Sequence, residues 1–178
     1  VDYINEGVRV IRLENIGVLT FKDESPTFVS NEKYLSIQKH TVGSGDIIFS
    51  SFIIGETRLV ILTKFIKKAI NKADCFCVRV SDKTINRKYL AYFLTTKDIY
   101  NQLVIEVHGA TRPRINTKQL KGSLVPYCKI DEQLKIVQAI EARFSVADKI
   151  EESITQSIKH TEVLRESILK NAFEGKLT

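Results

Sequence analysis

The sequence predicts an α+β protein, with a mixed α/β globule followed by a long helix that forms coiled coils. Between Pro126 and Gly175 there is neither proline nor glycine, so nothing in that stretch forces a helix to end. Upstream, short strand-like and helical segments intermingle without a regular β-α-β period. These observations divide the chain into an expected globule, residues 1–130, and an expected helical arm, residues 131–178.

Apolar or small residues recur through the arm in steps of three and four. They are Val137, Ile140, Phe144, Ala147, Ile150, Ile154, Ile158, Thr161, Leu164, Ile168 and Ala172. This is the coiled-coil spacing, sustained for about five heptads. At a rise of about 1.5 Å per residue the helix would span roughly 65 Å, far more than one small domain covers. We therefore expect a partner helix, which would pack on a seam consisting of Ile150, Ile154, Ile158, Thr161, Leu164, Ile168 and Ala172.

The ends of the arm carry helix signals, and its middle carries one irregularity. Asp131 is a good N-cap residue and Gly175 supplies a C-terminal stop. Ser145 and Asp148 have capping-box spacing, so the sequence fits a helix broken near Ser145 as well as it fits a continuous one.

Composition bounds the class of protein. No hydrophobic run approaches the eighteen or so residues of a membrane span, and the first residues lack a signal-peptide pattern. The three cysteines, Cys75, Cys77 and Cys128, have no zinc-ligand spacing, which favours buried free thiols in a reducing cytoplasm and no bound metal. The chain has no methionine, which indicates a fragment or a trimmed chain.

Charge is unevenly distributed. Residues 131–178 hold seven Lys or Arg against nine Asp or Glu, whereas residues 1–130 hold twenty against twelve. A basic globule joined to a mildly acidic arm favours a polyanion as partner for the globule and protein as partner for the arm.

The pattern along the globule predicts its elements in order. Expected strands cover 8–13, 16–21, 47–51, 58–63, 73–80 and 123–128; expected helices start near residue 31 and cover 86–94, 96–106 and 117–121. The glycine turn before residue 47 is not a phosphate-binding P-loop, because no Gly-Lys-Ser/Thr follows it.

Two segments supply candidate DNA contacts. Residues 64–72 place four lysines among apolar residues, which is either a solvated face or a phosphate clamp. Residues 107–116 display two arginines around a proline, and arginine suits bidentate contacts to phosphate or guanine. Salt bridges to neighbouring acids are the alternative for these arginines. The candidate DNA-binding residues are Arg112, Arg114, Asn116, Lys118, Lys67, Lys68, Lys64 and Arg58.

Nothing in the sequence has the pattern of a catalytic site. His40, His108 and His160 are isolated, without the companions of a catalytic triad. An adenine methyltransferase would carry an Asn/Asp-Pro-Pro-Tyr-like loop, and the segment 124–127 matches it only superficially because its first positions are apolar. We therefore expect a protein without catalytic residues of its own.

The order of these features resembles the target-recognition half of the specificity (S) subunit of type I restriction–modification systems. The matching elements are Glu6-Gly7 with Arg12 and Asn15, Gly45-Asp46-Ile47-Ile48, Tyr89-Leu90-Ala91-Tyr92-Phe93-Leu94, Gly109-Ala110-Thr111-Arg112-Pro113-Arg114-Ile115-Asn116, Leu124-Val125-Pro126 with Glu132-Gln133 and Ile136-Val137, and Ile168-Leu169 with Ala172-Phe173-Glu174-Gly175-Lys176-Leu177. They cover nearly the whole chain.

The resemblance implies a function without chemistry. In that family two recognition domains each read one half of a split site in double-stranded DNA, and two long helices pair antiparallel. The helices dock methyltransferase (M) subunits, which bind S-adenosylmethionine, and restriction (R) subunits join for cleavage. This chain holds half of that plan, which two copies would restore as a homodimer. The alternative is a coiled-coil interaction module or adaptor that does not bind DNA.

Overall fold

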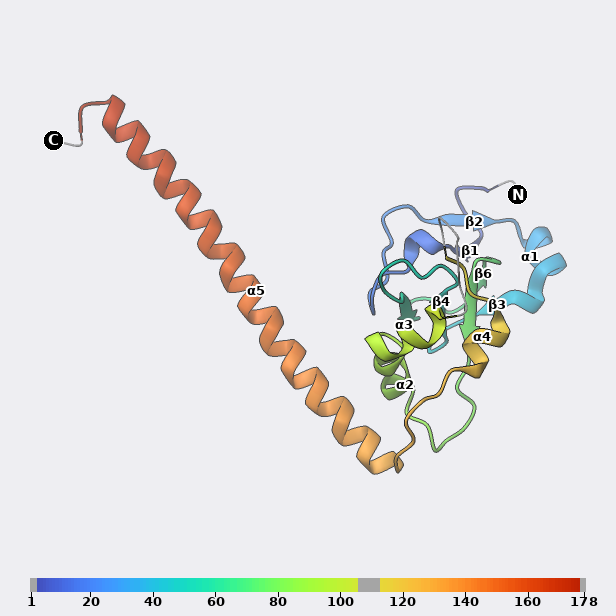
Figure 1. Cartoon of the computed structure of the whole chain (residues 1–178). Helices are drawn as coiled ribbons and strands as arrows, with labels where there is room; N and C mark the ends of the chain where they lie inside the picture. Colours follow the sequence, from blue (N-terminus) through green and yellow to red (C-terminus); the bar gives the residue numbers. More distant parts are fainter. Residues whose placement is uncertain (1–2, 106–112, 177–178) are drawn as a thin grey trace. The chain divides into compact units, whose positions relative to one another are not determined.

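A computed structural model describes residues 3–105 and 113–176 of the chain (Figure 1). The fold consists of two compact units, Val1–Gln133 and Leu134–Thr178, which are described separately below. The boundary expected from the sequence, between residues 130 and 131, falls within the first turn of helix α5 (Ile130–Phe173). None of the described helices is long and apolar enough to cross a membrane.

The first sheet of the globule has four short strands in the order β2-β1-β6-β3. They are β1 (Val8–Ile11), β2 (Thr27–Val29), β3 (Thr41–Val42) and β6 (Ala69–Asn71). Strand β1 runs antiparallel to β2 and parallel to β6, and β3 closes the edge antiparallel to β6. Helix α1 (Asn31–Ile37) packs Tyr34 and Ile37 against the valines of β1 and β2.

The second sheet has the order β5-β4-β7 and carries the main core. Strand β4 (Ile47–Ser50) is fully buried between antiparallel neighbours β5 (Leu59–Ile61) and β7 (Cys75–Val78). Helices α2 (Arg87–Phe93) and α3 (Lys97–Val104) cover it with residues such as Ala91 and Ile99. As expected, a buried strand follows the glycine turn. Helices α2 and α3 begin directly after their N-cap residues, Asn86 and Thr96.

The expected strand at 16–21 is wrong, because this stretch forms a tight turn. The Gly17 amide donates to the Thr20 carbonyl, and Leu19 adopts a φ of 58°. The buried side chain of Asn15 holds the turn by accepting from the Arg12 amide and donating to the Lys22 carbonyl. Ile16 is buried, whereas Val18 is 40% exposed, and only isolated bridges from these two residues replace pairing along the run.

The expected strand at 123–128 is also wrong. The segment after α4 (Thr117–Gly122) is extended but has no strand partner among the described residues. The Gln102 side-chain amide takes that role, since it donates to the Leu124 carbonyl at 3.1 Å and accepts from the Leu124 amide at 2.8 Å. The Tyr89 hydroxyl donates to the Pro126 carbonyl in the same segment.

Helix α5 is continuous, which decides the alternative left open at Ser145. It begins at Ile130, so Asp131 lies in its first turn and is not the N-cap, although an acid there still interacts favourably with the helix dipole. It ends as expected at Gly175, which has a φ of 70°. The Lys176 amide donates to the Asn171 carbonyl and the Gly175 amide to the Ala172 carbonyl, the two bonds of a Schellman motif.

Gln133 joins the first turn of α5 to the globule. The side chain is fully buried, and its oxygen accepts from the Asn86 amide at 2.7 Å. Its nitrogen donates to the carbonyls of Thr84 at 2.9 Å and Cys128 at 2.8 Å. Because both side-chain donors and the acceptor are used, a carboxylate or an apolar side chain cannot replace this glutamine without loss.

Only one cysteine matches the expected buried thiols. Cys75 is buried, which raises the pKa of its thiol to about 12, and all three thiols are free. Cys77 is exposed and Cys128 is half-buried, so the expectation is wrong for Cys77. Cys75 and Cys77 lie on one face of β7 as the spacing requires, but burial on this face falls from Cys75 to Cys77.

Candidate nucleic-acid interface

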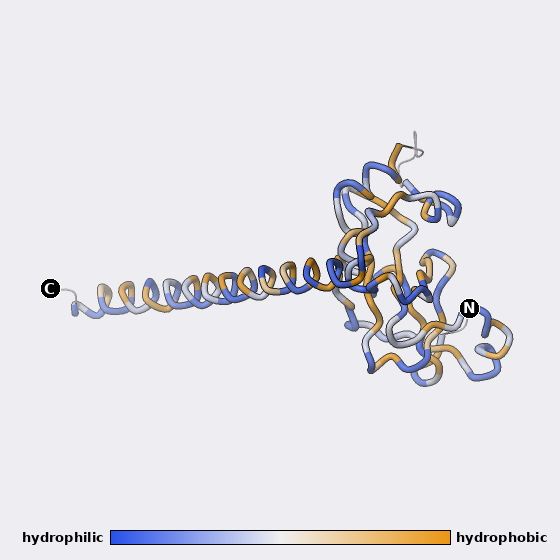
Figure 2. Tube along the Cα trace, turned by 90° about the horizontal axis from the view of Figure 1, so that it is seen from below, coloured by the Kyte–Doolittle hydropathy of each residue, from blue (hydrophilic) through white to orange (hydrophobic). Residues whose placement is uncertain are grey.

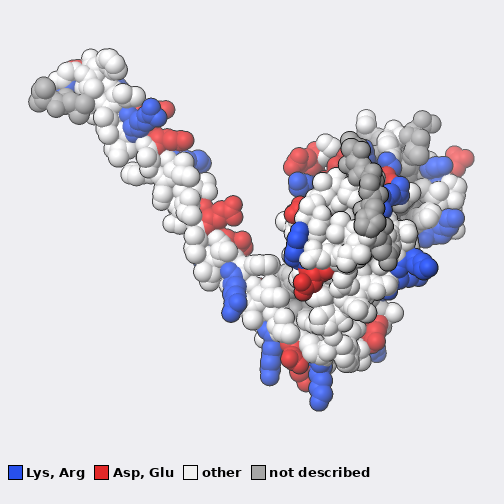
Figure 3. All heavy atoms as spheres, viewed as in Figure 1, with Lys and Arg blue, Asp and Glu red and all other residues white. Residues whose placement is uncertain are grey.

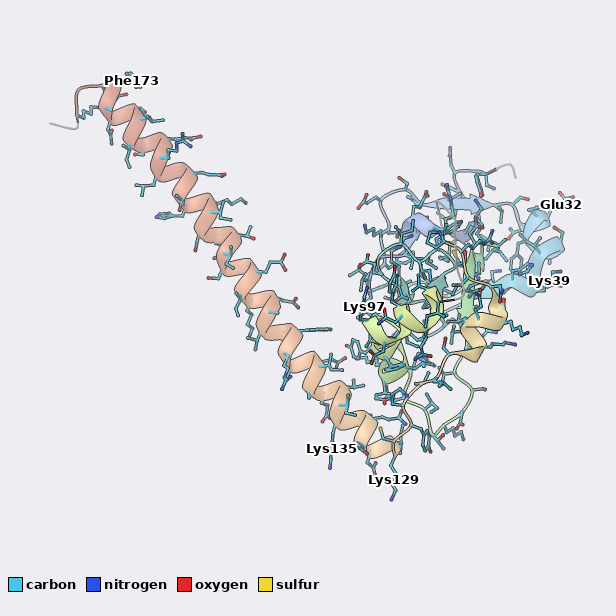
Figure 4. All side chains as sticks on the ribbon, in the orientation of Figure 1. Glu32, Lys39, Lys97, Lys129, Lys135 and Phe173 are labelled. Atoms are coloured by element: carbon cyan, nitrogen blue, oxygen red, sulfur yellow. The ribbon has the colours of Figure 1, made fainter. Side chains whose placement is uncertain are left out.

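A groove of about 420 Å³ with mixed polar and apolar lining runs over the end of the first sheet and along β7. Its lining residues come from five elements and are Lys39, His40, Thr41, Val42, Asn71, Ala73, Cys75, Phe76, Cys77, Arg79 and Thr117. It continues past Phe76 and Thr117 into a recess of about 320 Å³ that Arg114 and Asn116 line. We call the two together the groove. Lys39 projects from the turn after α1, on the side of the globule that holds α4 (Figure 4).

Arg114 is held on a rigid backbone at one end of the groove. The Ile53 amide donates to the Pro113 carbonyl, and the Ile115 amide donates to the Ser51 carbonyl. Ile115 is buried in the main core, which fixes the residue beside Arg114. The guanidinium lies 5.5 Å from the Phe52 ring centroid and forms a salt bridge from Nη2 to Asp74 Oδ1 at 3.1 Å.

Arg79 lies at the other end of the groove and is also paired. Its Nε and Nη2 donate to the two carboxylate oxygens of Asp46 at 2.8 and 2.6 Å, and Nη2 also donates to the Thr41 carbonyl. The guanidinium holds the pKa of the Asp46 carboxyl below its usual range and keeps its own pKa raised. The pair links β7 to the turn before β4.

Lysines supply the unpaired positive charge around the groove. Lys and Arg gather over the part of the globule that holds α1 and α4 (Figure 3). Lys39 lines the groove and Lys118 lies on α4, and neither has an acidic partner among the residues that the structure describes. Exposed ammonium groups in this setting attract phosphate through long-range charge.

The predicted arginine-loop residues have different positions. Arg112 lies outside the described residues. Arg114 lines the groove, and its salt bridge to Asp74 is the alternative that the sequence analysis left open for it. Asn116 caps α4, because its side chain accepts from the Gln119 amide at 2.9 Å. Lys118 lines a separate recess between α3 and α4.

The predicted lysine-run residues do not line the groove. Lys64, Lys67 and Lys68 lie exposed on the loop between β5 and β6, and Lys68 Nζ lies 4.5 Å from the ring centroid of Tyr34. Arg58 is half-buried beside β5. Strand β6 begins at Ala69 inside this run, and the exposed lysines before it fit the solvated face that the sequence analysis left open.

The sequence analysis missed Lys39, Asn71, Phe76 and Arg79, because Lys39 and the segment 71–79 come together only when the sheets assemble. One signal was available for Arg79. Arg79 continues the alternation of Cys75 and Cys77 by one position past the end of β7. A buried Cys75 would therefore place Arg79 on the same face, beyond the buried part of the strand. No cluster of three or more metal-ligating side chains occurs among the described residues.

Helix α5 presents the predicted seam on an apolar face. The larger seam residues remain about half exposed, from 47% at Ile168 to 56% at Ile158. Apolar turns recur along the length of the helix in Figure 2. Between them, Ser153, Ser157 and Thr161 line a shallow recess together with Ile154 and Ile158. The hydroxyls of Ser157 and Thr161 donate to carbonyls one turn earlier, so this recess has few unsatisfied donors.

Comparisons with known proteins assign this architecture to a family. Residues 6–160 match the family described as the type I restriction modification DNA specificity domain. The specificity subunit of the type I restriction enzyme EcoBI from Escherichia coli is 30% identical over 180 residues, which cover 99% of this chain and 37% of that protein. The EcoDI specificity subunit from the same organism is 28% identical over 140 residues, 79% of this chain and 30% of that protein.

A solved structure supports the same fold. A chain from the work described as the structural basis of complex assembly and conformational transition of the type I R-M system superposes with a TM-score of 0.73. It shares 17% sequence identity, and the match covers 98% of this chain and 41% of the other. This chain thus spans well under half of these relatives. Because the family match covers most of its length, the chain belongs to the type I restriction modification DNA specificity domain family.

Proposed function

We propose that this chain is the DNA-reading half of a type I specificity subunit. The globule binds one half of a bipartite site in double-stranded DNA, and α5 joins two copies as an antiparallel homodimer in the cytoplasm. The chain itself is not catalytic and binds no cofactor. Methylation takes place in M subunits that hold S-adenosylmethionine, and cleavage requires R subunits.

One observation carries the DNA-binding part of the proposal. The groove combines immobilised arginines with an unpaired lysine, Lys39, around a recess that an apolar ring, Phe76, and a polar helix start, Thr117, also line. Lysines contribute affinity through phosphate neutralisation, and fixed side chains read base edges. An adaptor without DNA binding would have no use for this combination.

Duplex binding at several salt concentrations tests this proposal. Fluorescence anisotropy with the full chain should give an association constant that falls linearly with salt on a double logarithmic plot. Lys39→Ala should lower affinity on every duplex and reduce that slope by about one unit. Affinity that does not change with salt, or no binding to duplex DNA, would favour the adaptor.

The partner proposal rests on α5. The seam is apolar and half exposed over its length. Methyl transfer from tritiated S-adenosylmethionine tests whether M subunits dock there. The chain alone should transfer nothing, and adding M subunit should restore transfer to DNA. Residues 1–144 should fail in this rescue, because both the docking surface and the second copy are lost with the helix.

A further inference from the structure

The two arginines of the groove differ from its lysines in one respect: each arginine already has a carboxylate partner. Arg79 is paired through two donors with Asp46, and Arg114 is paired through one with Asp74. An arginine beside a carboxylate adds little net charge to the surface, so it contributes weakly to phosphate attraction. Such an arginine instead binds a ligand through its remaining N–H donors, which point in a fixed direction.

Asp74 is positioned by the same backbone network that holds Arg114. The Ser51 amide donates to the Asp74 carbonyl on one side of the chain, and the Ser51 carbonyl accepts from Ile115 on the other. Residue 51 therefore lies between the two partners, with Phe52 next to it as the surface on which the guanidinium stacks. Three neighbouring segments thus fix the arginine, the acid and the ring.

The guanidinium keeps donors for a ligand. Nη2 forms the salt bridge with Asp74 and donates at 3.5 Å to the Ala73 carbonyl, whereas Nε and Nη1 have no partner among the described residues. The side chain is 49% exposed and lines the recess with Phe76 and Thr117. Guanine presents two acceptors, N7 and O6, on its major-groove edge, which matches arginine donors.

We propose that Arg114 reads a guanine in the half-site and that Asp74 and Phe52 are its positioning residues. This inference rests on the proposed function and goes beyond it by assigning affinity and base preference to different residues of the groove. Lysines such as Lys39 bind phosphate and determine affinity, whereas Arg114 determines base preference. Asp74 gives the arginine its direction and at the same time removes its non-specific attraction to phosphate.

The test uses the full chain and a preferred duplex, obtained by selection from a randomised pool with the wild-type protein. Affinity for this duplex and for one with the selected guanine replaced is then measured at several salt concentrations. Arg114→Ala should lower discrimination between the two roughly 5- to 150-fold and leave the salt slope nearly unchanged. Lys39→Ala should instead leave the discrimination nearly unchanged and lower the salt slope by about one unit.

Asp74→Ala separates a positioning role from a merely structural one. The freed arginine should bind phosphate, so non-specific affinity and the salt slope should rise, the slope by about one unit, while discrimination falls. Asp74→Asn keeps an acceptor for Nη2, so it should keep most of the discrimination and still raise the slope. Glu24→Ala, an exposed acid outside the groove, changes net charge equally and should leave both quantities unaltered.

Two results would overturn the inference while leaving the proposed function intact. One is an Arg114→Ala slope that falls by about one unit, with equal loss on every duplex, which would make Arg114 a phosphate contact. The other is an Asp74→Ala affinity that falls on all DNA, which would make Asp74 a structural residue. A wild-type chain that binds no duplex, or selects no sequence, would contradict the proposed function itself.

Discussion

The globule and helix α5 differ in where they place apolar side chains. In the globule, residues such as Phe49 and Ile53 are 0% exposed, because they are buried between the second sheet and helices α2 and α3. In α5, Ile154 and Ile158 remain 55% and 56% exposed. Burial within the chain therefore stabilises the globule, whereas the seam of α5 keeps its apolar side chains about half exposed. The two regions should respond to mutation independently.

The largest effect should come from a charge in the seam. Ile154→Glu would bury a carboxylate in the dimer and should weaken association by on the order of 3–5 kcal/mol. Sedimentation velocity should show a mass of about twice 20.3 kDa for the wild type and 20.3 kDa for the variant. Val163, which is 64% exposed and lies on the opposite side of the helix, is the matched control. Dissociation by Val163→Glu as well would mean that the seam is not the contact face.

The next effect should be confined to the globule. Gln133→Ala leaves the Asn86 amide and the carbonyls of Thr84 and Cys128 without a partner, which should cost about 2–3 kcal/mol. All six tyrosines lie within residues 1–133 and there is no tryptophan, so tyrosine fluorescence during urea unfolding follows the globule alone. Gln138→Ala, at an exposed position, should leave the midpoint unchanged. An unaltered midpoint for Gln133→Ala would show that these bonds contribute nothing net.

A smaller effect should be confined to α5. Gly175→Ala places a side chain at a φ of 70°, which should cost about 1 kcal/mol in the last turn. Circular dichroism at 222 nm should show slightly lower thermal stability of the helix, with tyrosine fluorescence unchanged. A stability equal to the wild type would mean that the Schellman motif does not hold the helix end.

The smallest effect concerns acid. Because Arg79 lowers the pKa of Asp46 below 3.8, the pair stabilises the globule above that pH, and its contribution is lost as the pH falls through the lowered pKa. Arg79 is 62% exposed, so the contribution should be under about 1 kcal/mol. Arg79→Gln should lower the urea midpoint at pH 7 and leave it closer to that of the wild type at pH 2.5. An equal loss at both pH values would point to packing rather than charge.

The sequence predicted elements with a local signal. Caps located α1, α2 and α3, and the unbroken helical spacing located α5, because these features depend on neighbours within a few residues. It missed β2, β3 and β6, which are two or three residues long and exist only through their partners in the sheet. The apparent strand at 123–128 is wrong because its partner is the side chain of Gln102, which no periodicity indicates.

In the candidate site, too, only the residues with a local sequence signal could be predicted. Arg114 and Asn116 stand out in a short arginine-rich loop and do line the groove. Lys39 comes from the turn after α1, whereas Phe76 lies on β7 and Arg79 directly follows it, so no local pattern groups all three. The division between paired arginines and unpaired lysines likewise depends on Asp46 and Asp74, acids that sequence spacing does not connect with their partners.

Selection of duplexes from a randomised pool, with the wild type and Ile154→Glu in parallel, tests the central claim most directly. If each globule reads one half-site and α5 joins two copies, the wild type should enrich two inverted copies of one short motif at a single fixed spacing. Ile154→Glu should enrich the same motif as a single copy, with lower affinity because the gain from simultaneous binding is lost. A single motif for the wild type, or paired motifs that survive Ile154→Glu, would contradict the account.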